Sequence, residues 1–522
     1  MLTKRRTIKR QPHIKESISA PSFMDRRTFL KQSGLAASAA ALATGVPLAR
    51  VHEAEANTEG NLNDEIKKVL SVCTHCSVGC TVTAEVQNGV WVGQEPSFDS
   101  PFNLGAHCAK GASVREHAHG ERRLKYPTKM ENGQWKRISW EQAIEEIGAR
   151  FNKIRLESGP DSVYWLGSAK FSNEQAILFR KFAAYCGTNN VDHQARICHS
   201  TTVAGVANTW GYGAMTNSYN DIHNSKAMFF IGGNPAEAHP VSLLHILKAK
   251  EQNQAPLIVC DPRFTRTAAH ADEYVRLRPG TDVAVIWGLL WHIFENGWED
   301  EEFIQQRVWG MDQIRSEVSK WTPEEVEKVS GVPGSQLRNV AQTLAENRPA
   351  TVVWCMGGTQ HTNGNNNTRA YCILQLALGN MGKEGGGTNI FRGHDNVQGA
   401  TDLGVLCHTL PGYYGLSTGA WKHWSRVWET DYDYLVDRFD SAEIMSAKGI
   451  PVSRWFDGVI EEPGNIEQPN PVQAMVFWGH APNSQTRLPD MKRAMEQLDT
   501  LVVIDPYPTM PAVMQDLSLI HN

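Results

Sequence analysis

The chain has 522 residues, of which 41% are hydrophobic and 20% charged, and its formal net charge is −5. This length exceeds what one hydrophobic core can organise, so we expect roughly three or four domains with the composition of a globular protein. The slightly acidic balance gives no support for a nucleic-acid partner, and any anionic ligand must be held by local positive groups.

The N-terminal segment has the pattern of an export signal. Residues 25–31 read DRRTFLK and precede a weakly apolar, alanine-rich run at 34–49, and small residues at 54 and 56 supply a cleavage site. An arginine pair directly before such a run predicts a twin-arginine signal. Because twin-arginine transport moves folded proteins, we expect residues 1–56 to be signal and linker, a periplasmic location, and a cofactor inserted before export.

Four of the ten cysteines have a spacing that indicates a shared role. Cys73, Cys76 and Cys80 form a C-x2-C-x3-C triplet, and Cys108 follows later in the chain. We expect the triplet on one tight loop and the fourth thiolate on a returning strand, so that four sulfurs surround a [4Fe-4S] cluster. A structural zinc site is the alternative, although zinc sites usually show two C-x2-C pairs.

Beyond residue 120, apolar periodicity predicts alternating helices and buried strands, which is typical of parallel, doubly wound α/β sheets. A Ser-x-x-Gln capping pattern at Ser139 starts one helix, and further helices are expected at 283–296 and 323–345. The apolar face of the first helix should comprise Trp140, Ala143, Ile144, Ile147, Phe151 and Ile154, and strands are expected at 163–166, 227–231, 257–260, 352–356, 475–478 and 501–504.

The same strand–turn–helix–strand pattern occurs twice. Residues 229–235 (FFIGGNP) and 257–262 (LIVCDP) resemble residues 476–482 (VFWGHAP) and 501–506 (LVVIDP). Glycine at a strand end lets backbone amides approach a diphosphate, and an acidic residue at the next strand end can accept a hydrogen bond from a ribose or base. The repetition predicts two related nucleotide-binding halves.

Two regions give weaker signals. Residues 412–470 are rich in Trp and Tyr but lack clear periodicity, so we interpret them as an insertion or loop region. Cys198 and His199 lie in a polar stretch at 193–204. A lone cysteine is more often an inert buried residue, but a thiolate suits a soft or high-valent metal and a neighbouring imidazole can move a proton near neutral pH.

With these motifs in order, the chain resembles the catalytic subunits of exported, respiratory formate dehydrogenases in the molybdopterin oxidoreductase superfamily. The resemblance extends from the twin-arginine segment to near residue 510. Besides the four cysteines, it rests on Gly167–Lys170, Ala195–Ala204, Gly211–Asn217, Gly233–His239, Arg278–Asp282 and Arg392–Ala400.

The resemblance implies roles for individual residues. Cys198 matches the cysteine or selenocysteine that ligates the metal, His199 the active-site histidine that assists proton movement, and Arg392 the arginine that holds the formate carboxylate. Lys110 matches the lysine between the cluster and a pterin. Asn234, Glu237, Asp261, Gly280 and Asp282 fall in segments that bind one pterin guanine dinucleotide, and Gly479, Asn483 and Asp505 in those that bind the other.

The resemblance also implies a domain plan. We expect a small [4Fe-4S] domain at 57–120, a first α/β dinucleotide domain formed by 121–193 and 393–522, and a second formed by 194–392. The first of these α/β domains is expected to be discontinuous and incomplete. Members of the family continue into a C-terminal β-rich cap that this chain lacks, so we expect a C-terminal truncation.

The implied activity is oxidation of formate to carbon dioxide at a molybdenum or tungsten bis(molybdopterin guanine dinucleotide). Electrons would leave through the cluster to an iron–sulfur beta subunit and a membrane cytochrome b subunit. A periplasmic nitrate reductase-like oxidoreductase is one alternative, which Cys198-His199 together with Arg392-Gly393-His394 disfavours. A non-catalytic electron-transfer fragment is another, which the presence of Cys198, His199 and Arg392 disfavours.

Overall fold

The computed structural model describes residues 65–480, 485–509 and 518–521. The expected signal segment at 1–56 and the candidate ligand Asn483 lie outside these residues. Among the helices that are described, none combines the length and the apolar character that a bilayer crossing requires.

The N-terminal part of the described chain is a small antiparallel sheet of three strands, β1 (Lys67–Val72), β2 (Thr81–Gln87) and β3 (Val90–Pro96). Cys73 directly follows β1 and Cys80 directly precedes β2, so the cysteine triplet lies on the connection between paired strands, as expected. The fourth position differs from the expectation. Cys108 is the N-cap residue of the short helix α2 (Ala109–Ala112) and does not lie on a strand.

A five-stranded sheet has the order β10-β9-β8-β11-β12, and all its neighbours are parallel. Side chains alternate between its faces, so Phe229 packs in one buried core and Phe230 in the other. Both cores have helices on their outer side, so this sheet is doubly wound. Its strands are β8 (Ala227–Ile231), β9 (Leu257–Cys260), β10 (Glu273–Val275), β11 (Ala350–Trp354) and β12 (Thr388–Ile390), and its main helices are α9 (Leu243–Asn253), α10 (Asp282–Glu295), α14 (Gly334–Glu346) and α16 (Gly364–Ala377).

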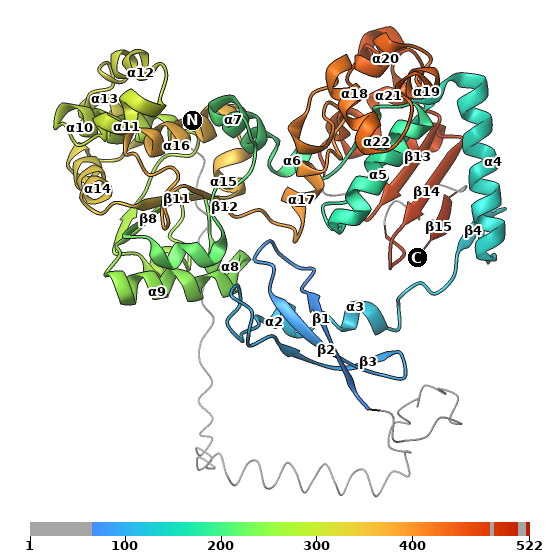
Figure 1. The fold of residues 1–522 in the computed structure, drawn as a ribbon, viewed down its shortest axis with the longest axis horizontal. Coiled ribbons are helices and arrows are strands. Elements are labelled where there is room, and N and C mark those ends of the chain that lie inside the picture. The colour runs from blue at the N-terminus through green and yellow to red at the C-terminus, as the bar shows by residue number, and fades with distance from the viewer. Residues whose placement is uncertain (1–64, 481–484, 510–517, 522) are drawn as a thin grey trace, which may run out of the picture. The chain divides into compact units, whose positions relative to one another are not determined.

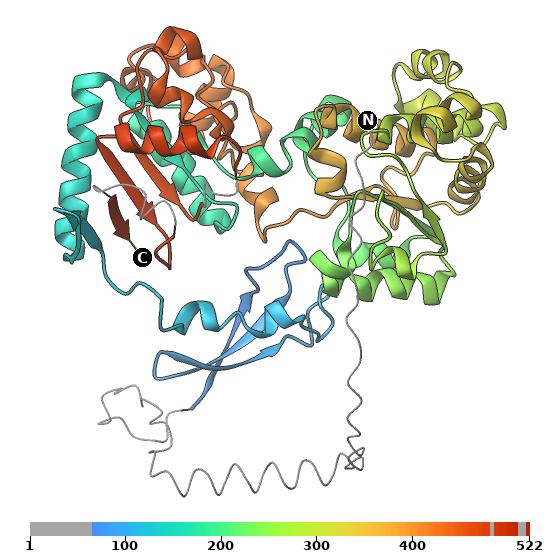
Figure 2. The ribbon, with the colours of Figure 1, turned by 180° about the vertical axis from the view of Figure 1, so that it is seen from behind.

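A seven-stranded sheet has the order β5-β4-β15-β14-β13-β6-β7, with parallel pairs from β15 to β7 and antiparallel pairs at β4 and β5. Figures 1 and 2 show its strands from opposite sides. The strands are β4 (Thr128–Glu131), β5 (Gln134–Arg137), β6 (Val163–Leu166), β7 (Val191–Asp192), β13 (Ala474–Trp478), β14 (Thr500–Ile504) and β15 (Ser518–His521); α4 (Trp140–Ser158) and α5 (Asn173–Cys186) pack on one face, and α21 (Asp457–Ile460) and α22 (Leu488–Gln497) on the other.

The predicted fold class, an α/β architecture of doubly wound sheets behind a small N-terminal domain, is confirmed. One large sheet takes its strands from residues 128–192 and 474–521, and the other from 227–390. The finer domain limits given above stay a prediction.

Two predicted regions differ from the structure. The single helix expected at 323–345 is two helices, α13 (Pro323–Ser330) and α14, because Gly331 has a φ of +75° and Pro333 cannot continue a helix. The region at 412–470 is largely helical and has its own core around the fully buried Trp421. Its longer helices are α18 (Thr418–Val427), α19 (Tyr432–Arg438) and α20 (Ala442–Ser446).

Helix α4 also differs from its predicted burial. Ser139 caps it by accepting a hydrogen bond from the Gln142 amide at 3.1 Å, but the Gln142 side chain bonds Glu146 and does not return to the cap. Trp140 and Ile144, expected in the core, are 41% and 66% exposed. They line an apolar groove of about 850 Å³ between α4 and α5, whose floor is formed by Val163, Trp165, Val476, Trp478, Val502 and Ile504.

Candidate active site and cluster-binding loop

The four cysteines of the N-terminal motif converge in one place. The Cys73 amide donates to the Cys80 carbonyl at 2.8 Å, which closes the loop between β1 and β2. Cys73 and Cys80 are buried, and Cys76 and Cys108 pack against the same apolar core. Burial, with the nearby charges of the other three, raises the pKa of the Cys80 thiol to about 12. Thiolates in this environment therefore need a strongly positive ligand to stabilise them.

The donor set of this loop fits the predicted cluster. A [4Fe-4S] cluster takes four cysteine thiolates as ligands, and here all four cysteines pack in or against one apolar core. A zinc ion can also take four thiolates, so the donor set alone is compatible with either group. Within the described residues, no group of three or more His, Cys, Asp or Glu side chains is already arranged around a metal position.

Lys110 extends beside this pocket. Its Nζ lies 3.4 Å from the Ala238 carbonyl. Burial raises the pKa of Cys76 and lowers the pKa of His239, and the Lys110 charge acts on both groups in the lowering direction. The side chain therefore lies between the cluster-binding loop and the residues that follow β8, and its place between a cluster and a pterin stays a prediction.

Cys198 ends the short helix α6 (Ala195–Cys198), and its backbone is fixed from a distant segment. The Thr359 hydroxyl donates to the Cys198 carbonyl at 3.1 Å. Burial raises the pKa of the Cys198 thiol, whereas a hydrogen bond from the Gly393 backbone and the charge of Arg392 lower it. The structure thus brings Cys198 and Arg392 together, although they are far apart in sequence.

His199 is held in place by its neighbours. Its Nδ1 lies 3.1 Å from the Thr202 hydroxyl, which also accepts a hydrogen bond from the Trp354 indole at 3.0 Å. The hydroxyl keeps one hydrogen and a second lone pair, so its bond to Nδ1 is compatible with either tautomer of the neutral ring. The Nε2 of His199 is buried and has no partner among the described residues. Burial and the Arg392 charge keep the pKa of His199 well below its ordinary value.

Arg392 follows β12 and is 1% exposed. Its Nη2 donates to the Gly213 carbonyl, while Nε and Nη1 are buried with no partner in the part of the chain that the structure describes. Burying guanidinium N–H groups without hydrogen-bond acceptors destabilises the folded state, unless a ligand supplies an acceptor beside them. The residues present therefore fit an anion that binds at Arg392.

The nearest carboxylate does not neutralise Arg392. Asp402 accepts a hydrogen bond from the Tyr413 hydroxyl at 2.6 Å, and no described carboxylate lies within ion-pair distance of the Arg392 guanidinium. Burial raises the pKa of Asp402, while Tyr413 and the Arg392 charge lower it. The positive charge of Arg392 remains available for an external ligand.

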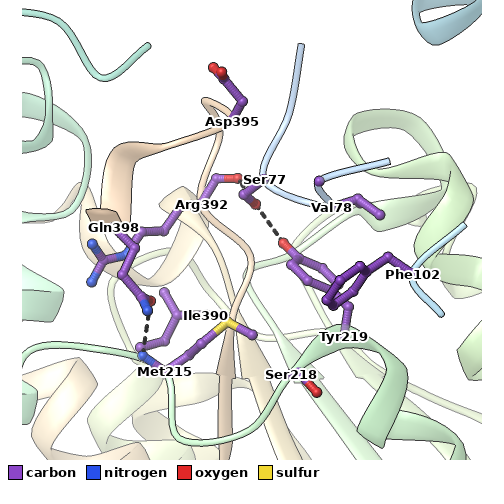
Figure 3. Close-up of a pocket in the computed structure, with 11 residues that line it drawn as sticks. Ser77, Val78, Phe102, Met215, Ser218, Tyr219, Ile390, Arg392, Asp395 and Gln398 are labelled. Atoms are coloured by element: carbon purple, nitrogen blue, oxygen red, sulfur yellow. Dashed lines mark hydrogen bonds between the residues drawn. The ribbon is translucent and has the colours of Figure 1, made fainter. Parts of the chain in front are cut away.

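A cavity of about 230 Å³ joins the cluster-binding loop to the Arg392 segment (Figure 3). Ser77 and Tyr219 lie on one side and Gln398 and the Arg392 side chain on the other. The full lining is Ser77, Val78, Gly79, Phe102, Met215, Ser218, Tyr219, Ile390, Arg392, Asp395 and Gln398.

The candidate dinucleotide residues of the first repeat follow β8 and β9. Asn234 accepts a hydrogen bond from the Thr267 hydroxyl at 2.8 Å, and Glu237 lies 3.7 and 3.5 Å from two exposed arginines. Asp261 accepts a hydrogen bond from the Arg263 amide at 2.8 Å. These side chains gather at the carboxyl ends of parallel strands, where such sheets bind ligands.

The remaining candidates lie on three other segments. Gly280 has a φ of +83° and free space at its missing Cβ, whereas Asp282 is 4% exposed and accepts a hydrogen bond from Tyr371 at 2.8 Å. In the second repeat, Gly479 follows β13, and Asp505 follows β14 and accepts from the Tyr507 amide at 3.0 Å. Their roles as ligands stay predictions.

Several site residues had no separate role in the sequence reasoning. Thr202 and Trp354 orient His199, Tyr413 shields Asp402, and Ser77 contacts the Arg392 backbone. Ser77 lies between two cysteines of the motif, which is the one signal that could have indicated it. Thr202 lies three residues after His199 in the same stretch, whereas the Trp354 contact joins segments 152 residues apart and Tyr413 lies in the region without periodicity.

Comparisons with known proteins agree with this picture. Residues 123–519 match the family model for molybdopterin oxidoreductase, and residues 66–120 match that for the molybdopterin oxidoreductase Fe4S4 domain. Over 457 residues the chain is 34% identical to the F420-dependent formate dehydrogenase 1 subunit alpha of Methanococcus maripaludis, covering 87% of this chain and 64% of the relative. It is 33% identical to formate dehydrogenase H of Escherichia coli over 464 residues, covering 87% and 62%.

Among solved structures, the acetylene hydratase of Pelobacter acetylenicus has the same fold. The TM-score is 0.67 at 22% sequence identity, covering 87% of this chain and 62% of that one. The chain thus spans a little under two thirds of the length of these relatives.

Proposed function

We propose that this chain, which belongs to the molybdopterin oxidoreductase family, is the catalytic portion of a formate dehydrogenase that oxidises formate to carbon dioxide. The observation that carries the proposal is the buried Arg392, whose Nε and Nη1 have no partner among the described residues and which lies beside Cys198. The reaction is proposed from the names of the relatives. The N–H groups of Arg392 that lack a partner indicate where its anionic substrate would bind.

Arg392 would bind the formate carboxylate. Charge-assisted hydrogen bonds from a guanidinium to a carboxylate are stronger than neutral ones, and burial strengthens them further. The bond from Nη2 to the Gly213 carbonyl fixes the plane of the guanidinium, so that formate would meet a pre-oriented donor.

His199 would add a neutral ring beside this charge. Its Nε2 is the ring nitrogen left without a partner among the described residues, and burial, with the Arg392 charge, lowers its pKa and keeps the ring uncharged at neutral pH. With a proton on Nε2, the ring would hydrogen-bond an oxygen of the substrate without adding a second buried cation.

The residues that would hold the metal cofactor are Cys198 as ligand and the candidate dinucleotide residues of the sequence analysis. Burial raises the pKa of the Cys198 thiol, whereas the bond from the Gly393 backbone and the charge of Arg392 favour its thiolate form. When bound, a molybdenum or tungsten bis(molybdopterin guanine dinucleotide) would supply the two-electron redox chemistry. The dinucleotide candidates are Asn234, Glu237, Asp261, Gly280, Asp282, Gly479, Asn483 and Asp505.

Electron exit and location complete the proposal. Electrons would leave past Lys110 to a [4Fe-4S] cluster on Cys73, Cys76, Cys80 and Cys108, and from there to an iron–sulfur beta subunit and a membrane cytochrome b subunit. The arginine pair at 26–27 supports export of the folded protein to the periplasm by the twin-arginine machinery.

The test is formate-dependent viologen reduction by metal-loaded protein isolated from a strain that carries the native gene. We expect Arg392→Ala to lower kcat/KM by about 100-fold or more, as for loss of a charged group that contacts the reacting substrate. Arg369→Ala, which removes an exposed arginine of α16, is the matched control and should leave the rate unchanged.

Metal and iron content would be measured in every sample. Loaded wild-type protein that reduces nitrate but does not oxidise formate would overturn the proposal and favour a nitrate reductase. Iron without molybdenum or tungsten would instead favour an electron-transfer fragment.

A further inference from the structure

The backbone carbonyl of Arg392 accepts hydrogen bonds from two side chains of different segments. One donor is the Ser77 hydroxyl, from the loop that carries the cysteine triplet, and the other is His239 Nε2 at 2.6 Å. Arg392 and His239 are 1% and 2% exposed, so the carbonyl is bound away from water. Buried hydrogen bonds of this kind hold their partners more rigidly than exposed ones.

The direction of each bond can be assigned. The Ser77 oxygen lies 2.5 Å from the Tyr219 hydroxyl, and Figure 3 shows Ser77 between that hydroxyl and the Arg392 carbonyl. Because a carbonyl only accepts, Ser77 must donate to it, and Tyr219 must then donate to Ser77. The result is a directed chain from Tyr219 through Ser77 to the backbone of Arg392.

A second connection joins the same two segments. Lys170 Nζ donates to the Thr74 carbonyl in the cysteine loop and lies 3.2 Å from Asp395 Oδ1, three residues after Arg392. The loop between β1 and β2 is therefore tied to the 392–395 segment on both sides of Cys76.

We propose that Ser77 is a positioning residue through which the cluster-binding loop sets the orientation of Arg392. Its neighbour Cys76 is a candidate cluster ligand, so the bound cluster would fix the loop, and the loop would fix the carbonyl from which the Arg392 side chain extends. By linkage, an anion on Arg392 would then change the binding free energy of the cluster by the same amount as the cluster changes that of the anion. This inference deepens the proposed function and rests on it for the identity of the anion.

The experiment compares loaded wild-type protein with Ser77→Ala, Ser77→Thr and Tyr219→Phe. Loss of one buried hydrogen bond that orients the arginine should raise the KM for formate about 3- to 10-fold with kcat changed by less than about 2-fold. Ser77→Thr keeps the hydroxyl and should restore most of the affinity. Tyr219→Phe leaves Ser77 without its own donor and should give an intermediate KM.

A second readout does not depend on turnover. The cluster would be reduced with dithionite and its electron paramagnetic resonance spectrum recorded with and without formate. In wild-type protein we expect formate to change the line shape, and in Ser77→Ala we expect no change although iron content is normal. If Ser77→Ala does not retain its cluster, the same spectra are compared for Tyr219→Phe, because this substitution leaves the sequence of the cysteine loop intact.

The outcomes separate the two proposals. The positioning role would be overturned if formate changed the cluster spectrum equally in wild type and in the Ser77→Ala or Tyr219→Phe variant, and if the KM for formate were also unchanged. Absence of formate turnover in loaded wild type, together with a cluster signal that an added anion changes only when Ser77 is present, would overturn the proposed substrate and leave the coupling intact.

Discussion

The two repeats of the chain, β8 to β9 and β13 to β14, match in their strand pairing and at their strand ends. Each pair is parallel, and each first strand ends at a glycine in the left-handed region, Gly232 at φ +67° and Gly479 at φ +59°. Each second strand ends at an aspartate that accepts from the amide two residues later, at 2.8 Å for Asp261 and 3.0 Å for Asp505.

The two repeats differ in how completely side chains pack against the faces of their sheets. Around β8 and β9 both faces of the five-stranded sheet are filled, and every residue of β8 is buried. Around β13 and β14 one face is filled, while the other opens into the groove between α4 and α5. A local sequence pattern therefore determines the strand and its turn, whereas segments far away in the chain determine the packing against them.

The largest loss of stability should come from a large-to-small substitution in the core of the five-stranded sheet, which is covered on both faces. Phe229→Ala, at a fully buried position of β8, should lower the free energy of unfolding by about 3–5 kcal/mol. Phe182→Ala, on the groove side of α5 at 54% exposure, should cost about 1 kcal/mol or less. Urea unfolding of both variants measures the contrast, and equal losses would mean that the groove is closed in solution.

The two turn glycines should respond unequally. An added Cβ at Gly232 would meet the Gly358 backbone nitrogen at 2.4 Å, so Gly232→Ala should cost about 2–4 kcal/mol in the free energy of unfolding. At Gly479 the nearest atom is the Ser168 hydroxyl at 2.9 Å, which can rotate, so Gly479→Ala should cost about 1 kcal/mol. Thermal unfolding would show this difference, and a larger loss at Gly479 would contradict it.

A smaller effect concerns acid stability, where the repeats should behave alike. Burial lowers the pKa of His480, after β13, to about 3 and that of His239, after β8, to about 4. Folded protein keeps both rings neutral while the unfolded chain takes up protons below its ordinary histidine pKa, so stability falls as pH falls from about 6.5.

His480→Gln should therefore remove about 2 kcal/mol of the stability lost between pH 7 and pH 5. His239→Gln should flatten the same slope but also lower stability at pH 7, because His239 bonds the Arg392 carbonyl. Urea midpoints at the two pH values provide the measurement. An unchanged slope in His480→Gln would show that this ring has the same pKa in the folded and unfolded protein, and so is not buried as described.

Much of the strand framework could be predicted from sequence alone. Apolar runs bounded by Gly, Pro or Asp gave the bounds of β6, β8 and β9, and the bounds of β11, β13 and β14 to within two residues. Such strands are buried on both faces, so their own composition identifies them. The helices of 412–470 could not be predicted because most are too short to show a period, and Ile144 was misplaced because it faces the groove between α4 and α5 and not the core.

Residues of the candidate site could be predicted from the sequence only where they lie in a family motif. Cys198, His199 and Arg392 came from the family resemblance, and the structure brings them together. The Trp354 and Ser77 contacts could not be predicted, because each joins segments more than a hundred residues apart that only the tertiary fold brings together. The Thr202 contact is local, since Thr202 lies three residues after His199 at the start of α7 (Ser200–Trp210).

The unneutralised charge of Arg392 also has a thermodynamic consequence. The folded state buries the Arg392 cation together with N–H donors that have no acceptor among the described residues. A small oxyanion that binds there stabilises the folded state, by about 2.7 kcal/mol when its concentration is 100 times its Kd. The melting temperature is then a property of the protein and its buffer salt together. A preparation in chloride and one in formate would be two different thermodynamic states of the same chain.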